Sequence, residues 1–246
     1  MNIEKAWKTF LKKVLNDGKK HEKDDGDKVL ESMINHAFIP NVQDSLFCHG
    51  NNITTDMFLD MIKNGVFNIE GYLIKDEALA GYVKQLDDTT QIFLEEDENG
   101  NLPFVYTYPE RLYNMNSVDR ENNQDHYNQI DVIVNRLKNY PGSNRAVATL
   151  YQVGLDKDEQ HIPCLNWIQC TIRDNKLILH VIFRSNDLWN AFPSNMLFLN
   201  YLGLKIVNEL KEVYPSLEFY GISYTSSSLH IYEGDIKQAK KVIGCD

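Results

Sequence analysis

Hydrophobic positions along the chain alternate between helical spacing and strand-like runs. In the first segment, apolar residues recur every three or four positions, at Trp7, Phe10, Leu11 and Val14. This spacing predicts an amphipathic helix that Gly18 would end. Helical spacing returns over 53–62, 69–86, 125–139 and 196–213, and the last of these segments is the most apolar. The predicted helices are thus spread over the whole chain.

Strand-like runs lie between these helices. They cover 33–42, 146–154, 164–173, 176–183 and 221–232, and Pro40 closes the first of them. Asp174 and Asn175 suit the turn of a hairpin between the third and fourth runs. The polar segments 19–28 and 95–101 are interpreted as an exposed loop and a surface turn. Because no linkers or repeats interrupt this pattern, it predicts one α+β domain spanning 1–246.

The composition is that of a globular protein that does not coat nucleic acid. Hydrophobic residues make up 43% of the 246 residues, and 25 Lys and Arg face 35 Asp and Glu, for a formal net charge of −10. A nucleic-acid backbone requires a basic surface, so this balance argues against DNA or RNA as a partner. A local anion site built from two or three arginines is compatible with it.

The four cysteines, Cys48, Cys164, Cys170 and Cys245, match neither a disulfide framework nor a zinc motif. Reduced thiols, a cytoplasmic location and no bound metal are therefore expected. The N-terminal segment scatters charges among its apolar positions, unlike a secretory signal. No apolar run approaches the roughly 18 residues that a membrane helix requires, so the protein is expected to be soluble, without a membrane partner.

Polar residues near the ends of predicted strands are the candidates for chemistry. Cys164 opens a strand, where an inert core cysteine is the usual alternative. Arg184 follows a run of uncharged residues expected to be buried, and a charge in that position needs a partner or a ligand. Asn195 begins the long apolar helix and could instead be its N-cap. His230 and Tyr232, two residues apart, share one side of the last strand.

Together these spacings resemble the thymidylate synthase family, which includes the phage-type pyrimidine nucleotide hydroxymethylases. The resemblance covers nearly the whole chain. The segments that carry it follow the family's order: the helix ending in Lys-Val-Leu-Asn-Asp-Gly, then Asn-Gly-Asn-Leu-Pro-Phe-Val-Tyr, Ser143-Asn144-Arg145, Pro163-Cys164, Arg184-Ser185-Asn186-Asp187, Asn195 and His230-Ile231-Tyr232. The resemblance implies a large mixed β-sheet flanked by helices, and a homodimer packed sheet to sheet.

The family's reaction moves a one-carbon unit from 5,10-methylenetetrahydrofolate to C5 of a pyrimidine nucleoside 5′-monophosphate. The resemblance implies that the Cys164 thiolate adds to C6, which makes C5 nucleophilic. Arg184 would lower the pKa of the thiol and would bind the phosphate together with Ser185 and Arg145. The other implied roles are base reading by Asn195, sugar 3′-hydroxyl binding by His230 and Tyr232, pterin binding by Asp187, proton removal near C5 by Tyr106, and support of the cysteine segment by Gln169. Packing alone could also explain the two tyrosines, Gln169 and His230.

Several positions depart from the family's pattern. The segment Ser143-Asn144-Arg145 keeps one arginine where the family has two, and the arginine of an early loop falls at Asp24, next to Lys23. The phosphate site therefore has fewer arginines than usual. The catalytic glutamate of the family aligns best with Glu70, and Asp60 is the alternative, but a solvated position on a helix could also explain either residue. Cys164 is followed by Leu165 rather than by His.

Different features indicate the base and the product. The side-chain amide of Asn195 matches O4 and N3–H of uracil, whereas family members that act on cytosine carry Asp there. Only fourteen residues follow Tyr232, while thymidylate synthases usually continue into a tail that closes over folate and excludes water. Hydroxymethylation of a uracil nucleotide is therefore the first hypothesis. The alternatives are a thymidylate synthase with a shortened tail, a dCMP or CMP hydroxymethylase, and an inactive nucleotide-binding member.

Overall fold

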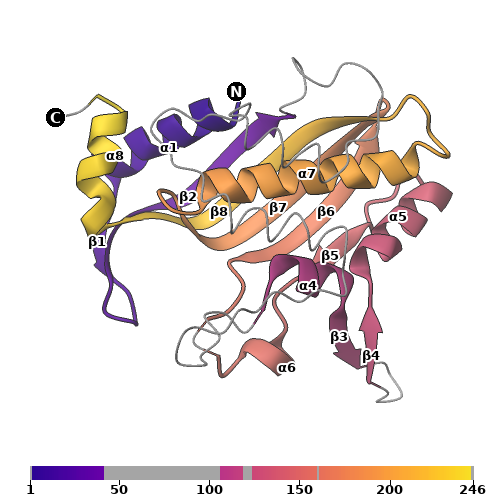
Figure 1. Ribbon diagram of the computed structural model, residues 1–246, viewed down its shortest axis with the longest axis horizontal. Helices are drawn as coiled ribbons and strands as arrows, with labels where there is room; N and C mark the ends of the chain where they lie inside the picture. Colours follow the sequence, from indigo (N-terminus) through magenta and orange to yellow (C-terminus); the bar gives the residue numbers. More distant parts are fainter. Residues whose placement is uncertain (1, 42–105, 119–123, 160, 245–246) are drawn as a thin grey trace, which may run out of the picture.

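The computed structural model describes residues 2–41, 106–118, 124–159 and 161–244, and every structural statement below refers to these residues (Figure 1). Its elements in chain order are α1 (Ile3–Asp17), β1 (Lys19–Glu22), β2 (Lys28–Pro40), α4 (Tyr108–Tyr113), β3 (Met115–Val118), β4 (Gln124–Tyr127), α5 (Gln129–Asn139), β5 (Val147–Thr149), α6 (Val153–Asp156), β6 (Leu165–Arg173), β7 (Lys176–Asp187), α7 (Phe192–Leu210), β8 (Glu218–Tyr232), the short 3₁₀ helix η2 (Glu233–Asp235) and α8 (Ile236–Val242).

A six-stranded mixed sheet organises the fold, with the strand order β1-β2-β8-β7-β6-β5. Its neighbouring strands are antiparallel except for β7 and β8, which are parallel. Parallel neighbours require a crossover connection, which α7 provides between them (Figure 1). The α+β class and the mixed sheet predicted from the sequence are confirmed.

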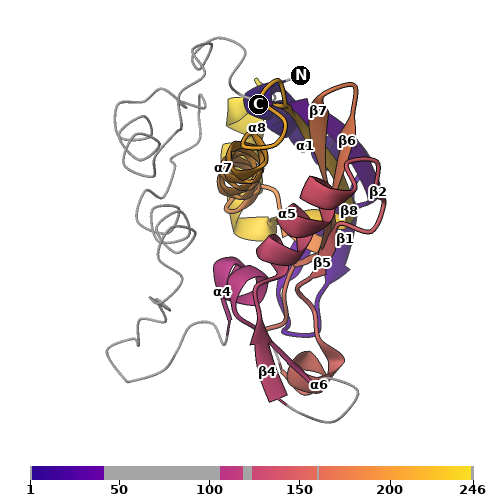
Figure 2. The same cartoon turned by 90° about the vertical axis from the view of Figure 1, so that its right-hand side faces the viewer.

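Helices cover one face of this sheet, and the described elements leave the other face bare (Figure 2). Helix α7 is apolar around its circumference and almost entirely buried. It lies so close to β8 that a Cβ atom at Gly203 would overlap the Phe219 ring. A larger residue at this position would therefore have to displace that ring.

The predicted N-terminal helix is confirmed as α1. The Asn2 side chain caps it by accepting a hydrogen bond from the Lys5 amide at 2.8 Å. Its buried face includes the four apolar residues that the spacing indicated. The Trp7 indole donates to the Leu188 carbonyl at 2.7 Å, which ties α1 to the turn directly after β7. Two candidate site residues flank that turn, Asp187 at the end of β7 and Asn195 in the first turn of α7.

Several element boundaries differ from the sequence-based expectation. Segment 19–28 is not a loop, because β1 pairs with the beginning of β2 as an edge hairpin whose side chains in β1 are all exposed. A fully exposed edge strand has no hydrophobic alternation, so the pattern could not reveal it. Helix α5 begins only at Gln129, after its N-cap Asn128, and α7 begins earlier than expected, with Pro193 in its first turn. Segments 53–62, 69–86 and 95–101 lie outside the described residues.

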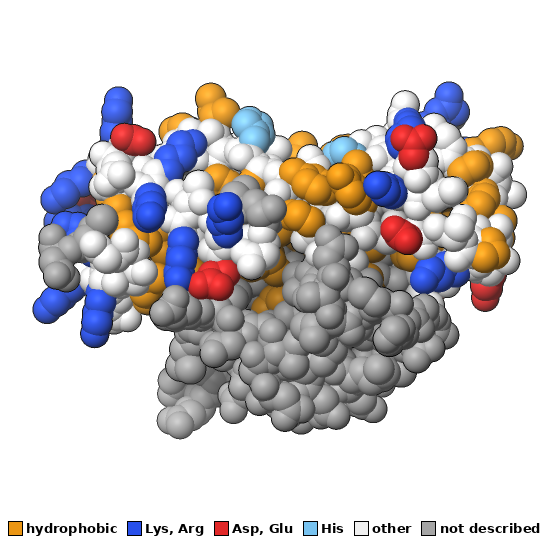
Figure 3. All heavy atoms as spheres, turned by 90° about the horizontal axis from the view of Figure 1, so that it is seen from above, with side chains coloured by type: hydrophobic (Ala, Val, Ile, Leu, Met, Phe, Trp, Pro, Cys, Tyr) orange, Lys and Arg blue, Asp and Glu red, His pale blue; other side chains and the backbone are white. Residues whose placement is uncertain are grey.

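The surface charge is unevenly distributed despite the acidic balance. Lysine and arginine side chains gather at the left-hand end of the molecule in Figure 3. Helices α1 and α8 together contribute seven lysines to the chain. The net charge therefore does not describe the local field at this end. Within the described parts of the chain, none of the helices combines the length and hydropathy needed to cross a lipid bilayer.

Candidate active site

The ends of three central strands and the tip of the β1–β2 hairpin come together at one edge of the sheet. Because β7 and β8 are parallel, their final residues are neighbours, and Asp187 lies opposite His230. Strand β6 is antiparallel to β7, so its beginning lies beside the end of β7, with Leu165 opposite Phe183. The carboxyl ends of parallel strands are where open sheets usually bind ligands. This edge holds most of the residues that the sequence singled out.

Cys164 directly precedes β6 and is half-buried against the hydrophobic core, so it is not fully enclosed as an inert core cysteine would be. That description fits Cys170, which is fully buried within β6 and whose pKa burial raises to about 12. The Cys164 carbonyl accepts a hydrogen bond from the Arg184 amide at 2.9 Å. The cysteine and the arginine are therefore held together through the backbone.

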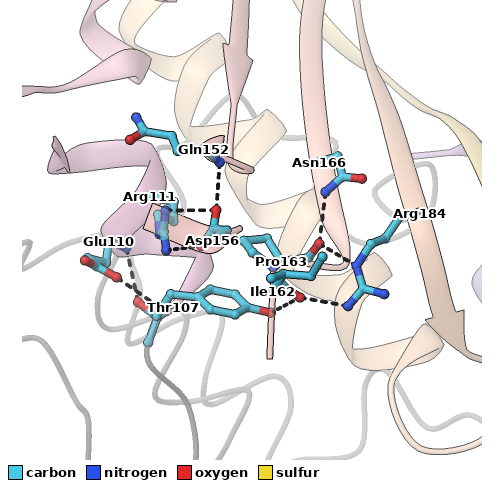
Figure 4. Close-up of polar contacts among 10 residues, drawn as sticks. Thr107, Glu110, Arg111, Gln152, Asp156, Ile162, Pro163, Asn166 and Arg184 are labelled. Carbon is cyan, nitrogen blue, oxygen red and sulfur yellow. Dashed lines mark hydrogen bonds and ion pairs between the residues drawn. The ribbon is translucent and has the colours of Figure 1, made fainter. Parts of the chain in front are cut away.

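The Arg184 guanidinium holds the segment that leads to the cysteine (Figure 4). Its Nε donates to the Pro163 carbonyl at 3.1 Å, and its Nη2 donates to the Ile162 carbonyl at 2.9 Å. Its Nη1 makes no hydrogen bond within the described residues. Arg184 is exposed, so this remaining nitrogen can bind an external anion.

Opposing influences act on the Cys164 thiol. Burial is the largest and raises its pKa, while the positive charges of Arg184 and then Lys23 lower it and the Asp187 carboxylate raises it. The net effect raises the pKa above the ordinary value, so the arginine expected to activate the thiol offsets burial only in part. A pKa raised in this direction keeps the ligand-free thiol protonated at neutral pH.

Lys23, at the tip of the β1–β2 hairpin, lies beside the candidate residues and had no role assigned from the sequence. Its Nζ donates to the Tyr232 hydroxyl at 2.9 Å and lies 3.3 Å from an Asp25 oxygen. Burial lowers its pKa, but the contacts with Tyr232 and Asp25 outweigh burial and the net pKa is raised. An ammonium has three donors, so one is left for a ligand. The sequence did contain a signal for Lys23, because this lysine is next to Asp24, the position where the family carries an arginine.

His230 and Tyr232 share one side of β8, as predicted, with ring centroids 5.3 Å apart. The Ser185 hydroxyl lies 3.3 Å from Nδ1 of His230, while Nε2 is buried and has no partner among the described residues. Burial, the largest influence, lowers the His230 pKa, so its ring is neutral at neutral pH. A neutral ring with an unused nitrogen can bind a ligand hydroxyl.

Asn195 lies inside the first turn of α7, whose N-cap is Ala191, so the N-cap alternative is wrong. Its Nδ2 donates to Oδ1 of Asn186 at 3.2 Å, and Nδ2 of Asn186 donates to the Tyr224 hydroxyl at 3.1 Å. Both amides are buried. Sequence reasoning quoted Asn186 only as part of a motif and missed that it orients the Asn195 amide.

The Asp187 carboxylate is used mainly to shape the turn after β7. Its Oδ1 accepts from the backbone amides of Trp189 and Asn190, each at 2.9 Å, and its Oδ2 accepts from the Asn190 side chain at 3.0 Å. A carboxylate can accept about four hydrogen bonds, so one acceptor position on Oδ2 remains. The residue therefore fits the donor-rich pterin of a folate.

The remaining predicted residues either contact the chain around Cys164 and Arg145 or lie outside the described chain. The Tyr106 hydroxyl donates to the Ile162 carbonyl at 3.2 Å, which places it at the cysteine segment. Gln169 instead donates to the Asn144 carbonyl at 2.8 Å, so its side chain supports the loop that carries the exposed Arg145. Glu70 and its alternative Asp60 lie outside the described residues. The described residues contain no cluster of three or more His, Cys, Asp or Glu side chains that could hold a metal.

The arrangement as a whole suits an anionic, planar ligand. Arg184 and Lys23 supply positive charge beside a thiol, and the oriented Asn195 amide supplies a donor and an acceptor. Comparison with known proteins agrees. A family model described as thymidylate synthase matches residues 5–244.

Three relatives carry the name "Putative thymidylate synthase". Those of Methanothermobacter marburgensis and Methanothermobacter thermautotrophicus are 28% and 29% identical, each over 98% of this chain and 95% of the relative. That of Methanocaldococcus jannaschii is 34% identical over 70% of this chain and 71% of the relative. The family consists of one-carbon transferases that bind a nucleoside monophosphate and methylenetetrahydrofolate. The chain belongs to the thymidylate synthase family.

Proposed function

We propose that this protein transfers a one-carbon unit from methylenetetrahydrofolate to C5 of a uracil nucleoside 5′-monophosphate and forms a hydroxymethyl product. The observation that carries the proposal is the joint placement of Cys164, Arg184 and the oriented Asn195 amide. The thiol supplies the nucleophile, the guanidinium supplies charge and the amide supplies base selection. Asp187 retains the acceptor position that would orient the pterin.

Addition of the thiol is the step that the chain itself provides. As the S–C6 bond forms, the thiol proton passes to solvent, the C5–C6 π electrons move toward C4 and O4, and C5 becomes an enolate carbon that attacks the one-carbon unit of the folate. Loss of the C5 proton then expels tetrahydrofolate and leaves an exocyclic methylene at C5. Water adds to this methylene to form the hydroxymethyl group, and cleavage of the S–C6 bond restores the ring and the thiolate. The Tyr106 hydroxyl, at the carbonyl of Ile162, is our candidate for moving the C5 proton.

Selection of uracil follows from the direction of the Asn195 amide. One Nδ2–H is used by Asn186, which leaves the second for O4 of uracil and leaves Oδ1 for N3–H. Cytosine presents the opposite pattern at these atoms. Turning the amide over to fit cytosine would bring two carbonyl oxygens together and lose the bond to Asn186. A buried mismatch of this kind costs about 1–3 kcal/mol.

The phosphate is assigned to Nη1 of Arg184, the Ser185 hydroxyl and Nζ of Lys23. We expect Lys23→Met to raise the KM for the nucleoside monophosphate about tenfold, because a charge-assisted hydrogen bond is lost. Lys20→Met, on the exposed strand of the same hairpin, is the matched control. Steady-state kinetics would contradict the assignment if both variants kept the wild-type KM.

Three short sequence motifs favour hydroxymethylation over methylation. They are Cys-x-Asn-x-x-Gln, Arg-Ser-Asn-Asp and Ser-Leu-His-x-Tyr, and they resemble those of the hydroxymethylases more than those of the thymidylate synthases. The methyl product is the second candidate, because the relatives are named after thymidylate synthase. Mass spectrometry of the product separates the two, since the nucleotide gains CH2O or CH2. In water enriched in heavy oxygen, only the hydroxymethyl product takes up the label. A methyl product formed together with dihydrofolate would refute the hydroxymethyl assignment.

A second copy of the chain is proposed as the partner of the bare sheet face. The large apolar side chains exposed there lie at Phe38, Val147, Ile182 and Tyr220. In such a dimer the exposed Arg145 could reach the partner's nucleotide. We expect Ile182→Lys to shift the mass measured by light scattering from a dimer to a single chain. A single-chain mass for the wild type would refute this packing.

A further inference from the structure

A buried ion pair connects α4 to the chain that leads into the cysteine segment (Figure 4). Nη2 of Arg111, on α4, lies 2.8 Å from Oδ1 of Asp156, the last residue of α6, and Nη1 lies 3.4 Å from Oδ2. Oδ2 also accepts the Gln152 amide at 2.7 Å. The two side chains are only 6% and 0% exposed. Nε of Arg111 is buried without a hydrogen-bond partner among the described residues, so the guanidinium is held by its two terminal nitrogens. Such a two-pronged pair has one preferred geometry, and removing either partner leaves a buried charge unpaired.

The other end of α4 contacts the same stretch of chain closer to Cys164. Tyr106, just before the helix, donates to the Ile162 carbonyl, and the Arg111 guanidinium lies over its ring, 5.5 Å from the centroid. The Ile162 carbonyl is the one that Nη2 of Arg184 binds. Arg111 of α4 therefore contacts the chain at Asp156, and Tyr106, just before the helix, contacts it at Ile162.

The short helix is itself locked in place. Thr107 and Glu110 form a reciprocal capping box, with the Glu110 amide donating to Thr107 at 3.1 Å and the Thr107 amide donating to Glu110 at 3.2 Å. Gln129 donates to the Arg111 carbonyl at 2.8 Å and so ties the helix to α5. A support fixed in this way can set the position of the chain it holds.

We propose that Arg111 and Asp156 are positioning residues for the nucleophile: their ion pair fixes the Ile162 and Pro163 carbonyls that keep the Arg184 guanidinium beside Cys164. This rests on the proposed role of Cys164 as the nucleophile. If the pair is broken, the two carbonyls move and Arg184 loses its acceptors. Its charge then leaves the thiol, and the thiolate becomes harder to form.

The test compares Asp156→Asn with Leu177→Ala. Leu177 is a buried residue at the opposite end of the β6–β7 hairpin. Its truncation is the control for a general loss of stability, and the two variants are compared when their melting temperatures fall by similar amounts. The rate of Cys164 alkylation by iodoacetamide is followed against pH by peptide mass spectrometry, and kcat and KM are measured separately. We expect Asp156→Asn to move the alkylation profile to higher pH and to lower kcat about tenfold or more, with a smaller rise in KM. Leu177→Ala should leave both profile and kcat near wild type.

Identical alkylation profiles and kcat values for the two variants would overturn the proposal. If Asp156→Asn does not fold, Tyr106→Phe provides the second test, because it removes only the hydroxyl that binds the Ile162 carbonyl. Its alkylation profile should also move to higher pH, and a profile superimposed on wild type would overturn the proposal. Alkylation requires no substrate, so this result stands even if the wild type fails to modify any uracil nucleotide, which would refute the proposed function alone.

Discussion

Cys164→Ala is expected to lower kcat by at least about a thousandfold while leaving the Kd for the nucleotide within about threefold of wild type. The reason is that C5 of uracil becomes nucleophilic only after a nucleophile adds to C6, and the thiol beside Arg184 is the nucleophile that we propose. Binding relies on other groups, above all Arg184, Lys23 and Asn195. Single-turnover kinetics and calorimetric titration measure the two quantities separately.

Cys170→Ala is the matched control for this experiment. Cys170 lies six residues further along, is fully buried in β6, and has a pKa raised to about 12 by burial, so its thiol is inert. Its replacement should leave kcat unchanged apart from a loss of stability. Equal turnover by Cys164→Ala and Cys170→Ala would exclude Cys164 as the nucleophile.

Asn195→Asp is expected to lower kcat/KM for the uracil nucleotide about a hundredfold or more, and to raise kcat/KM for the corresponding cytosine nucleotide. An ionised carboxylate has no hydrogen to donate to O4 of uracil and repels that oxygen. It accepts a hydrogen bond from the exocyclic amine of cytosine instead. Competition between the two nucleotides in one reaction, followed by mass spectrometry, gives the selectivity directly.

The control for the selectivity change is Asn208→Asp, which makes the same substitution at an exposed position of the same helix. It should alter neither selectivity nor kcat/KM. An Asn195→Asp variant that kept the wild-type preference would show that the base is read elsewhere. The bond between Asn195 and Asn186 would then serve only to attach α7 to β7.

The central part of the fold could be predicted from the sequence because its hydrophobic pattern is strong. The β6–β7 hairpin, with its turn at Asp174 and Asn175, and the apolar helix α7 lie close to their predicted bounds. Both turn residues have positive φ angles, as such a turn requires. Strand β1 was missed because its exposed polar residues are held by backbone pairing alone.

Sequence spacing could predict which residues belong to the candidate site, but not the contacts that they make. The spacing from Cys164 to Arg184 identified both residues, and the structure joins them at the end of β7. Spacing could not show that two of the guanidinium nitrogens of Arg184 bind backbone carbonyls. Nor could it pair Arg111 with Asp156, which are 45 residues apart. Such contacts depend on the tertiary arrangement rather than on local pattern.

The most direct test of thiol addition to C6 is exchange of the C5 hydrogen of a uracil nucleoside monophosphate in deuterated water, followed by proton NMR without folate. Addition of Cys164 makes C5 basic enough to take up a deuteron, and elimination then returns a nucleotide labelled at C5. We predict that wild-type protein erases the C5-hydrogen signal and that Cys164→Ala leaves it intact. Loss of the signal at the same rate with both proteins would contradict the account.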